Sequence, residues 1–130
     1  MSFADYWENE LLDHALNDGA YTAPTIYVGL STADPGDNAA ALAEPSGNGY
    51  ARVETSASDW AAASGGSKAN AAAITFPEAS GSWGTVTYVC LFDAATSGNL
   101  LASGALTEGL AITNGQTPRF SIGALTVTLG

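Results

Sequence analysis

The chain opens with apolar side chains at the three- and four-residue spacing of an amphipathic α-helix. These positions are Ala4, Trp7, Leu11, Leu12, Ala15 and Leu16. Ser2 and Asp5 form an approximate capping box, and Gly19 follows the last periodic residue as a C′ glycine does. The pattern predicts a helix within residues 1–19. Its apolar stripe must dock on the chain's own sheet or on a neighbouring subunit.

After Tyr21 the apolar period changes from helical to two, which is the period of a half-buried strand. Short strands separated by Gly-, Pro-, Asp- and Asn-rich turns are predicted at residues 25–32, 50–56, 71–77, 82–93, 100–106, 109–113, 118–123 and 124–130. The Gly/Ser-rich residues 59–70 are predicted to form an exposed connection, and Asn114-Gly115-Gln116 a tight turn. The pattern indicates a mainly β chain, specifically a jelly-roll-like antiparallel β-sandwich with one N-terminal α-helix. We expect one domain over residues 1–130, with the helix in 1–19 and the strands in 24–130.

The segment 81–106 contains no Lys, Arg or His, and Asp93 is its single charged residue. Alternation predicts that one face of its first strand turns to the core, namely Val86, Tyr88, Cys90 and Phe92. The second half of this strand is apolar on both faces, which is typical of a central strand or of one covered on its outer side.

The charge balance narrows the range of partners. Three Lys and Arg stand against 13 Asp and Glu, so the formal net charge is −10. Affinity for nucleic acids and for anionic membranes depends on Lys and Arg, so neither is an expected partner. The acidic surface serves solubility or meets a basic partner.

Candidate catalytic groups are few. His14 and Cys90 are the single histidine and the single cysteine, and their spacing suggests no nucleophile–base pair. We expect Cys90 to be a small buried apolar residue. His14, near Glu10 and Asp18, is a solvated helix-end histidine or, alternatively, a general base or pH switch. The chain is therefore not expected to be an enzyme or to hold a cofactor.

The sequence offers two candidate binding sites. The loop 33–49 offers oxygen ligands for calcium in Asp34, Asp37, Asn38 and Glu44, but it lacks the spacing of a calcium loop and is predicted to be a turn. No metal is expected. The three tryptophans, Trp7, Trp60 and Trp83, form either a sugar-stacking platform or parts of the core and of an interface.

The helical segment combines aromatic and acidic side chains. Its acids are Asp5, Glu8, Glu10, Asp13 and Asp18, with no Lys or Arg among them. Like charges repel along a helix unless it is docked or faces basic groups of a partner. We therefore expect a partner interface formed by Phe3, Tyr6, Trp7, Glu8 and Glu10. The alternative is that the helix only caps the sandwich of its own chain.

Several stretches carry a resemblance to a known family. They are "ENELLDHALN" (8–17), "YVGLSTADP" (27–35), "EPSGNGYARV" (44–53) and "ITFPEASGSWGTVTYVCLFDAATSGNLLASGAL" (74–106). Together they resemble small tailed-bacteriophage virion proteins commonly labelled phage tail fibre proteins, and similar small β proteins serve as head decoration (cement) proteins. The resemblance implies a virion structural protein and brings no catalytic residues with it.

From this resemblance we expect a capsid decoration protein on the outer surface of the head, assembled in the cytoplasm of the bacterial host. Expected partners are the major capsid protein or other virion proteins, and two further copies in a homotrimer. Nucleic acid and membrane are not expected partners. The alternative is a tail fibre or tail-tip component, including a receptor- or carbohydrate-binding module.

Overall fold

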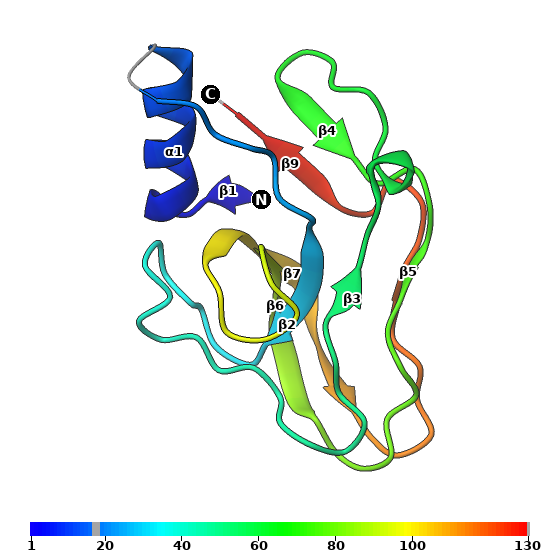
Figure 1. The fold of residues 1–130 in the computed structure, drawn as a ribbon. Helices are drawn as coiled ribbons and strands as arrows, with labels where there is room; N and C mark the ends of the chain where they lie inside the picture. Colours follow the sequence, from blue (N-terminus) through cyan, green and yellow to red (C-terminus); the bar gives the residue numbers. More distant parts are fainter. Residues whose placement is uncertain (17–18, 130) are drawn as a thin grey trace.

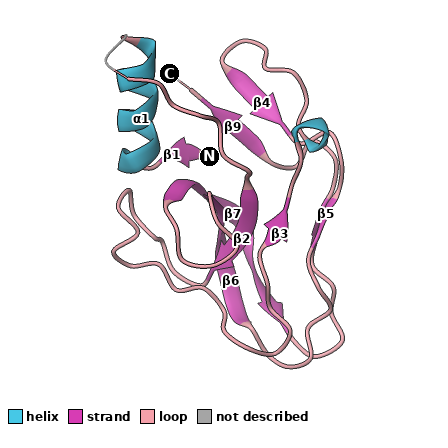
Figure 2. Cartoon of the chain, viewed as in Figure 1, coloured by secondary structure: helices cyan, strands magenta, loops and turns pink. Residues whose placement is uncertain are grey.

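The computed structural model describes residues 1–16 and 19–129, and within them one α-helix, α1 (Asp5–Ala15), lies between a short first strand and a series of further antiparallel strands (Figures 1 and 2). The largest sheet has five strands in the order β1 (Ser2–Phe3), β7 (Leu100–Ile112), β6 (Gly84–Phe92), β2 (Tyr27–Ser31) and β3 (Val53–Glu54). Every neighbouring pair is antiparallel. The prediction of a mainly β fold with one N-terminal helix is confirmed.

Two short ladders accompany this sheet. β4 (Ser67–Ala69) pairs with β9 (Thr126–Thr128), and β5 (Ile74–Thr75) pairs with β8 (Arg119–Phe120). A 3₁₀ turn over Ala57–Asp59 leads toward β4. The prediction of an exposed connection over 59–70 therefore missed a strand. β4 forms because β9 lies beside it, and the Ser67 and Thr128 hydroxyl oxygens lie 2.7 Å apart.

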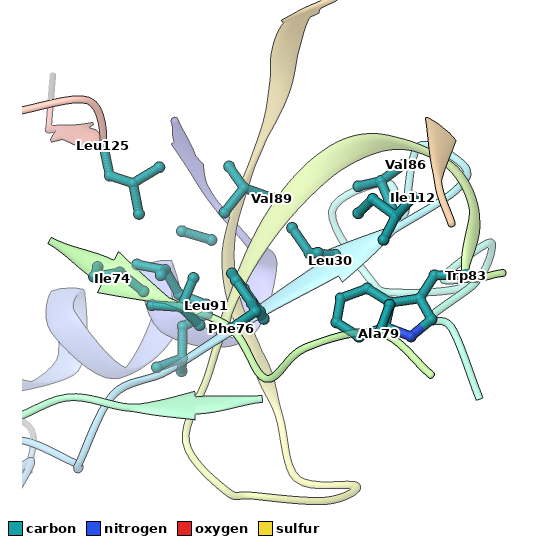
Figure 3. Packing of buried hydrophobic residues seen from close by; sticks show 13 residues of the cluster. Leu30, Ile74, Phe76, Ala79, Trp83, Val86, Val89, Leu91, Ile112 and Leu125 are labelled. Carbon is teal, nitrogen blue, oxygen red and sulfur yellow. The ribbon is translucent and has the colours of Figure 1, made fainter. Parts of the chain in front are cut away.

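The main core lies between one face of the large sheet and the segments that carry the two ladders (Figure 3). The sheet contributes Val28, Leu30, Val89 and Leu91 among others, and the other side contributes Ile74, Phe76 and Leu125. This arrangement resembles a sandwich, with apolar side chains from both layers filling the space between them. The jelly-roll connectivity remains a prediction.

The β6 strand does not keep the predicted alternation. Val86 lies opposite Leu110 of β7, whereas Tyr88 lies opposite Ala105, so the register shifts between them. After this irregularity Val89 and Leu91 join Val86 in the main core, while Cys90 and Phe92 belong to a smaller cluster. Assigning Val86, Tyr88, Cys90 and Phe92 to one face was therefore wrong. The prediction that the second half of the strand is covered on both faces is confirmed, because residues 89–92 are all buried.

The smaller cluster is covered by the loop 33–52, from which Ala39 and Leu42 pack against Phe92 and its neighbours. Two charged residues hold this loop in place. Arg52 donates from Nη2 to Glu44 Oε1 at 2.6 Å and from Nε to Glu44 Oε2 at 2.9 Å. Its Nη1 donates to the main-chain oxygens of Ala94 and Ser97 in the β6–β7 turn. The guanidinium carbon also lies 3.5 Å from the centre of the Phe92 ring.

Tyr50 extends this arrangement to β2. Its hydroxyl donates to Glu44 Oε2 at 2.6 Å and accepts the N–H of Leu30 at 3.0 Å. Burial raises the pKa of Tyr50 above its ordinary value, and the hydrogen bond to Glu44 raises it further. Gly29 makes the close approach possible, because a Cβ there would lie 2.8 Å from the Phe92 ring and 3.0 Å from the Tyr50 hydroxyl.

The N-terminal helix is shorter than predicted. Ser2 and Phe3 form β1, opposite Ser103 and Ala102 of β7, so Ser2 does not cap a helix. The N-cap is Ala4, which makes no side-chain capping bond, and Leu16 is the C-cap, so Gly19 is not the C′ residue. The predicted start was wrong because pairing with β7, far along the chain, supplies partners that local sequence does not reveal. Asp18 lies outside the described residues.

The Glu44–Arg52 pair generates a stability test. We expect Arg52→Met to lower the free energy of unfolding by about 3 kcal/mol, near the lower end of the range for breaking a buried ion pair. The lower end applies because the Glu44 side chain keeps 21% of its exposure, against 5% for Arg52. Urea unfolding measures the change. Arg119→Met, at an exposed arginine, is the matched control and should change stability by less than about 0.5 kcal/mol.

The double variant Glu44→Gln/Arg52→Met should recover part of the loss, because it leaves no unpaired carboxylate against the sheet. Equal effects of Arg52→Met and Arg119→Met would show that the loop is held by its apolar contacts alone.

Candidate functional site

The aromatic end of the N-terminal segment turns inward. Phe3 and Trp7 stack with ring centroids 4.4 Å apart, and Phe3, Tyr6 and Trp7 are half-buried against the main core. Burial raises the pKa of Tyr6, and the nearby carboxylates of Glu10 and Asp93 raise it further. The segment therefore docks on its own sheet through its aromatic residues.

The residues predicted to form a partner interface thus divide into two groups. Phe3, Tyr6 and Trp7 contribute to packing within the chain, while Glu8 is exposed and Glu10 is half-buried. Their contact with a partner remains a prediction.

The apolar positions of the helix do not share one face, contrary to the prediction of a single stripe. Ala4 is buried, and Trp7 and Leu11 are half-buried, but Leu12 is 57% exposed and Leu16 is 77% exposed. Leu12 and Leu16 lie one turn apart and therefore side by side. Glu8 precedes Leu12 by one turn on the same side. We call Glu8, Leu12 and Leu16 the outer stripe of α1.

On the inner side of α1 lies a surface pocket of about 200 Å³. The chain entering β2 passes between α1 and the β4–β9 ladder here (Figure 1). The lining is almost wholly apolar and includes Trp7, Ile26, Trp60, Leu91, Val127 and the exposed Lys68. We call this the Trp7–Trp60 pocket. Sequence reasoning did not find it, although it had grouped two of its tryptophans for their aromatic surface.

The third tryptophan lies elsewhere. Trp83 is buried in the main core, where its Nε1 donates to the main-chain oxygen of Asn48 at 2.8 Å and its ring meets Tyr50 edge to face. The three tryptophans therefore do not form one platform.

The acids of the loop 33–49 are engaged in local structure. Asp34 Oδ1 accepts the N–H of Gly36 at 2.9 Å, which is the turn predicted there, and Asn38 Oδ1 accepts the N–H of Ala40. The main-chain oxygen of Asp37 accepts the N–H of Asp5 at the start of α1. Glu44 is paired with Arg52. Across residues 1–16 and 19–129, no group of three or more His, Cys, Asp or Glu is arranged to hold a metal ion.

His14 and Cys90 occupy different environments. His14 is exposed near the end of α1, and its Nδ1 accepts the N–H of Tyr21 at 3.2 Å. Cys90 is fully buried within the sheet, as expected. Burial raises the pKa of its thiol to about 12, and the negative charge of Glu44 adds to the increase. A thiol with such a pKa is not a nucleophile at neutral pH.

In the part of the chain that the structure describes, no helix is long and apolar enough to cross a membrane.

Comparison with known proteins gives one family. A family model described as "Podophage GP4 fiber I protein gp80" matches residues 2–128. The chain therefore belongs to this family and is a phage virion structural protein of the fibre type, which confirms the resemblance. None of the curated proteins compared with the chain matches it.

The environment of Cys90 predicts how its thiol reacts. We expect a thiol-specific reagent at pH 8 to leave the native protein unmodified and to label one thiol per chain in denaturant. Because the ordinary pKa is 9.0 and the folded value is about 12, only the unfolded chain loses this proton between those values. The free energy of unfolding should therefore fall as the pH rises through that range.

Cys90→Ala is the control, since it removes the labelling and this part of the pH dependence. Rapid labelling of the native protein at pH 8 would contradict the buried position of Cys90.

Proposed function

We propose that this member of the podophage fibre family is a structural component of a phage tail fibre, that it acts by binding other virion proteins, and that it is not an enzyme. The observation that carries the proposal is the family match, which spans residues 2–128 of the 130-residue chain. Because nearly the whole chain is matched, the family's description applies to the fold as a unit.

The family's description favours the tail over the head. The matching family is named for a fibre, whereas a cement protein decorates the capsid surface. Our initial expectation of capsid decoration therefore has less support than its alternative, a tail fibre or tail-tip component. A position on the outer surface of the virion and a homotrimeric assembly remain parts of the proposal.

The side chains that could carry chemistry have structural partners, which supports a non-enzymatic role. Glu44 is paired with Arg52, the His14 ring accepts a main-chain N–H, and Cys90 is buried with a raised pKa. A catalytic group instead needs to reach a substrate with its proton or lone pair available.

The Trp7–Trp60 pocket supports binding of protein rather than sugar. Sugar recognition combines a stacking ring with several polar groups that fix the hydroxyls, and ligand pockets in general place a few polar groups among apolar ones. This pocket has an almost wholly apolar lining, with Lys68 as its one charged residue. Aromatic residues with apolar neighbours are typical of the centre of a protein interface.

Labelling of virions tests the proposed position. We expect gold-labelled antibodies against this protein to mark the tail in electron micrographs of intact phage, because a fibre component is attached there. Phage from which the gene has been deleted is the control and should show no label. Label distributed over the head would contradict the tail position and restore the cement hypothesis.

A further inference from the structure

The outer stripe of α1 is an apolar surface that its own chain leaves open. No residue of α1 is fully buried, and Leu12 and Leu16 are more than half exposed. Two neighbouring leucines on the outside of a short helix leave apolar surface in water, and covering that surface favours association. Acids border them, with Glu8 one turn before Leu12 and Asp13 directly after it, and both are exposed.

The Trp7–Trp60 pocket is complementary to the outer stripe, because it is an apolar hollow beside a positive charge. Its volume of about 200 Å³ exceeds that of an apolar cavity of about 150 Å³ that accepts benzene, so one leucine side chain fits it. Lys68 is the charged residue in its lining and the single lysine of the chain. Among residues 1–16 and 19–129 the structure shows one ion pair, between Arg52 and Glu44. Lys68 therefore has no acidic partner within these residues.

One copy cannot satisfy both surfaces by itself. Trp7 lies on the inner side of α1 and lines the pocket, whereas Leu12 and Leu16 lie on the outer side of the same helix. A second copy brings the missing half of each contact, a leucine beside an acid for the pocket and a pocket beside a lysine for the stripe. The local charges attract, although two copies with a formal charge of −10 each repel one another at long range.

We propose that the outer stripe of one copy docks in the Trp7–Trp60 pocket of a second copy. A leucine of the stripe fills the pocket, and Glu8 or Asp13 pairs with Lys68. The contact joins different surfaces of the two copies, so it is head-to-tail, and repetition of it closes a ring when the rotation permits. The proposal names a partner for the assembly role proposed above. It does not depend on the position in the virion, so virion labelling and self-association fail independently.

Self-association of the full chain, followed by sedimentation equilibrium at micromolar concentrations, tests the contact. The wild type should associate. The double variant Leu12→Asp/Leu16→Asp should raise the dissociation constant about tenfold or more, equivalent to a loss of about 1.4 kcal/mol or more of association free energy. Leu110→Asp is the matched control, because Leu110 is 49% exposed and lies on β7, outside both surfaces. All of these positions are exposed, and circular dichroism verifies that each variant folds.

Charge reversal tests the pairing. Lys68→Glu should weaken association, and adding Glu8→Lys/Asp13→Lys should restore it. Mixing the Leu12→Asp/Leu16→Asp chain, which keeps its pocket, with the Lys68→Glu chain, which keeps its stripe, should give dimers that grow no further. This result distinguishes a head-to-tail contact from a symmetric one.

Three results would overturn the proposal. The first is a wild-type chain that stays monomeric at all concentrations, including one that associates only when another virion protein is added. The second is an association that the stripe and Lys68 variants leave unchanged. The third is a loss of association with Leu110→Asp as large as that with Leu12→Asp/Leu16→Asp, which would indicate non-specific association through apolar surface.

Discussion

The interaction on which the central sheet depends is the stacking of Arg52 on Phe92, with Glu44 bound to the Nε and Nη2 edge of the guanidinium. It secures the loop 33–52 over one face of the sheet, so β6 can be apolar on both faces without exposing Cys90 and Phe92. An arginine suits this place because its planar group stacks on a ring and also binds a carboxylate through two N–H groups. Gly29 is the matching constraint, since any side chain there would displace the ring or the tyrosine hydroxyl beneath this pair.

The packing of the loop 33–52 on the sheet also engages several of the polar side chains of the chain. Glu44 and Arg52 neutralise each other, Cys90 is buried beneath the loop, and the Asp34 carboxylate accepts a hydrogen bond from the main chain of Gly36 in the same loop. Polar groups with such partners stabilise the fold. The outer stripe of α1 and the Trp7–Trp60 pocket on its inner side are among the surfaces that stay exposed. For a phage fibre protein, apolar surface next to isolated charge is the chemistry of assembly with other chains.

Much of the fold could be predicted from local pattern, and the failures have physical causes. Alternation located β2 and β6, and residues 94–99 were predicted to be the turn between the strands that became β6 and β7. The Asn114-Gly115 turn exists too, with the N–H of Gln116 bonded to the oxygen of Thr113. However, β8 pairs with β5 and not with β7, because the turn leads the chain out of the large sheet. Of the site, the aromatic and acidic residues of the N-terminus were named, but their faces were not, since Leu12 was assigned to the docked side.

The sequence by itself determined the class of the protein: a β-rich, acidic chain with a short N-terminal helix and no evident catalytic pair, whose motifs resemble phage fibre proteins. The fold class and the acidic character follow from composition and from side-chain periods, which depend only on residues close together in the sequence, whereas the family came from the resemblance of the motifs. Only the tertiary structure decided that Ser2 and Phe3 form a strand, that β6 changes faces after Val86, and that Trp7 and Trp60 share a pocket while Trp83 does not. Each of these depends on a partner far along the chain. The spacing of apolar residues within one segment does not indicate which distant strand pairs with it, because strand pairing depends on how all the side chains of the core pack together.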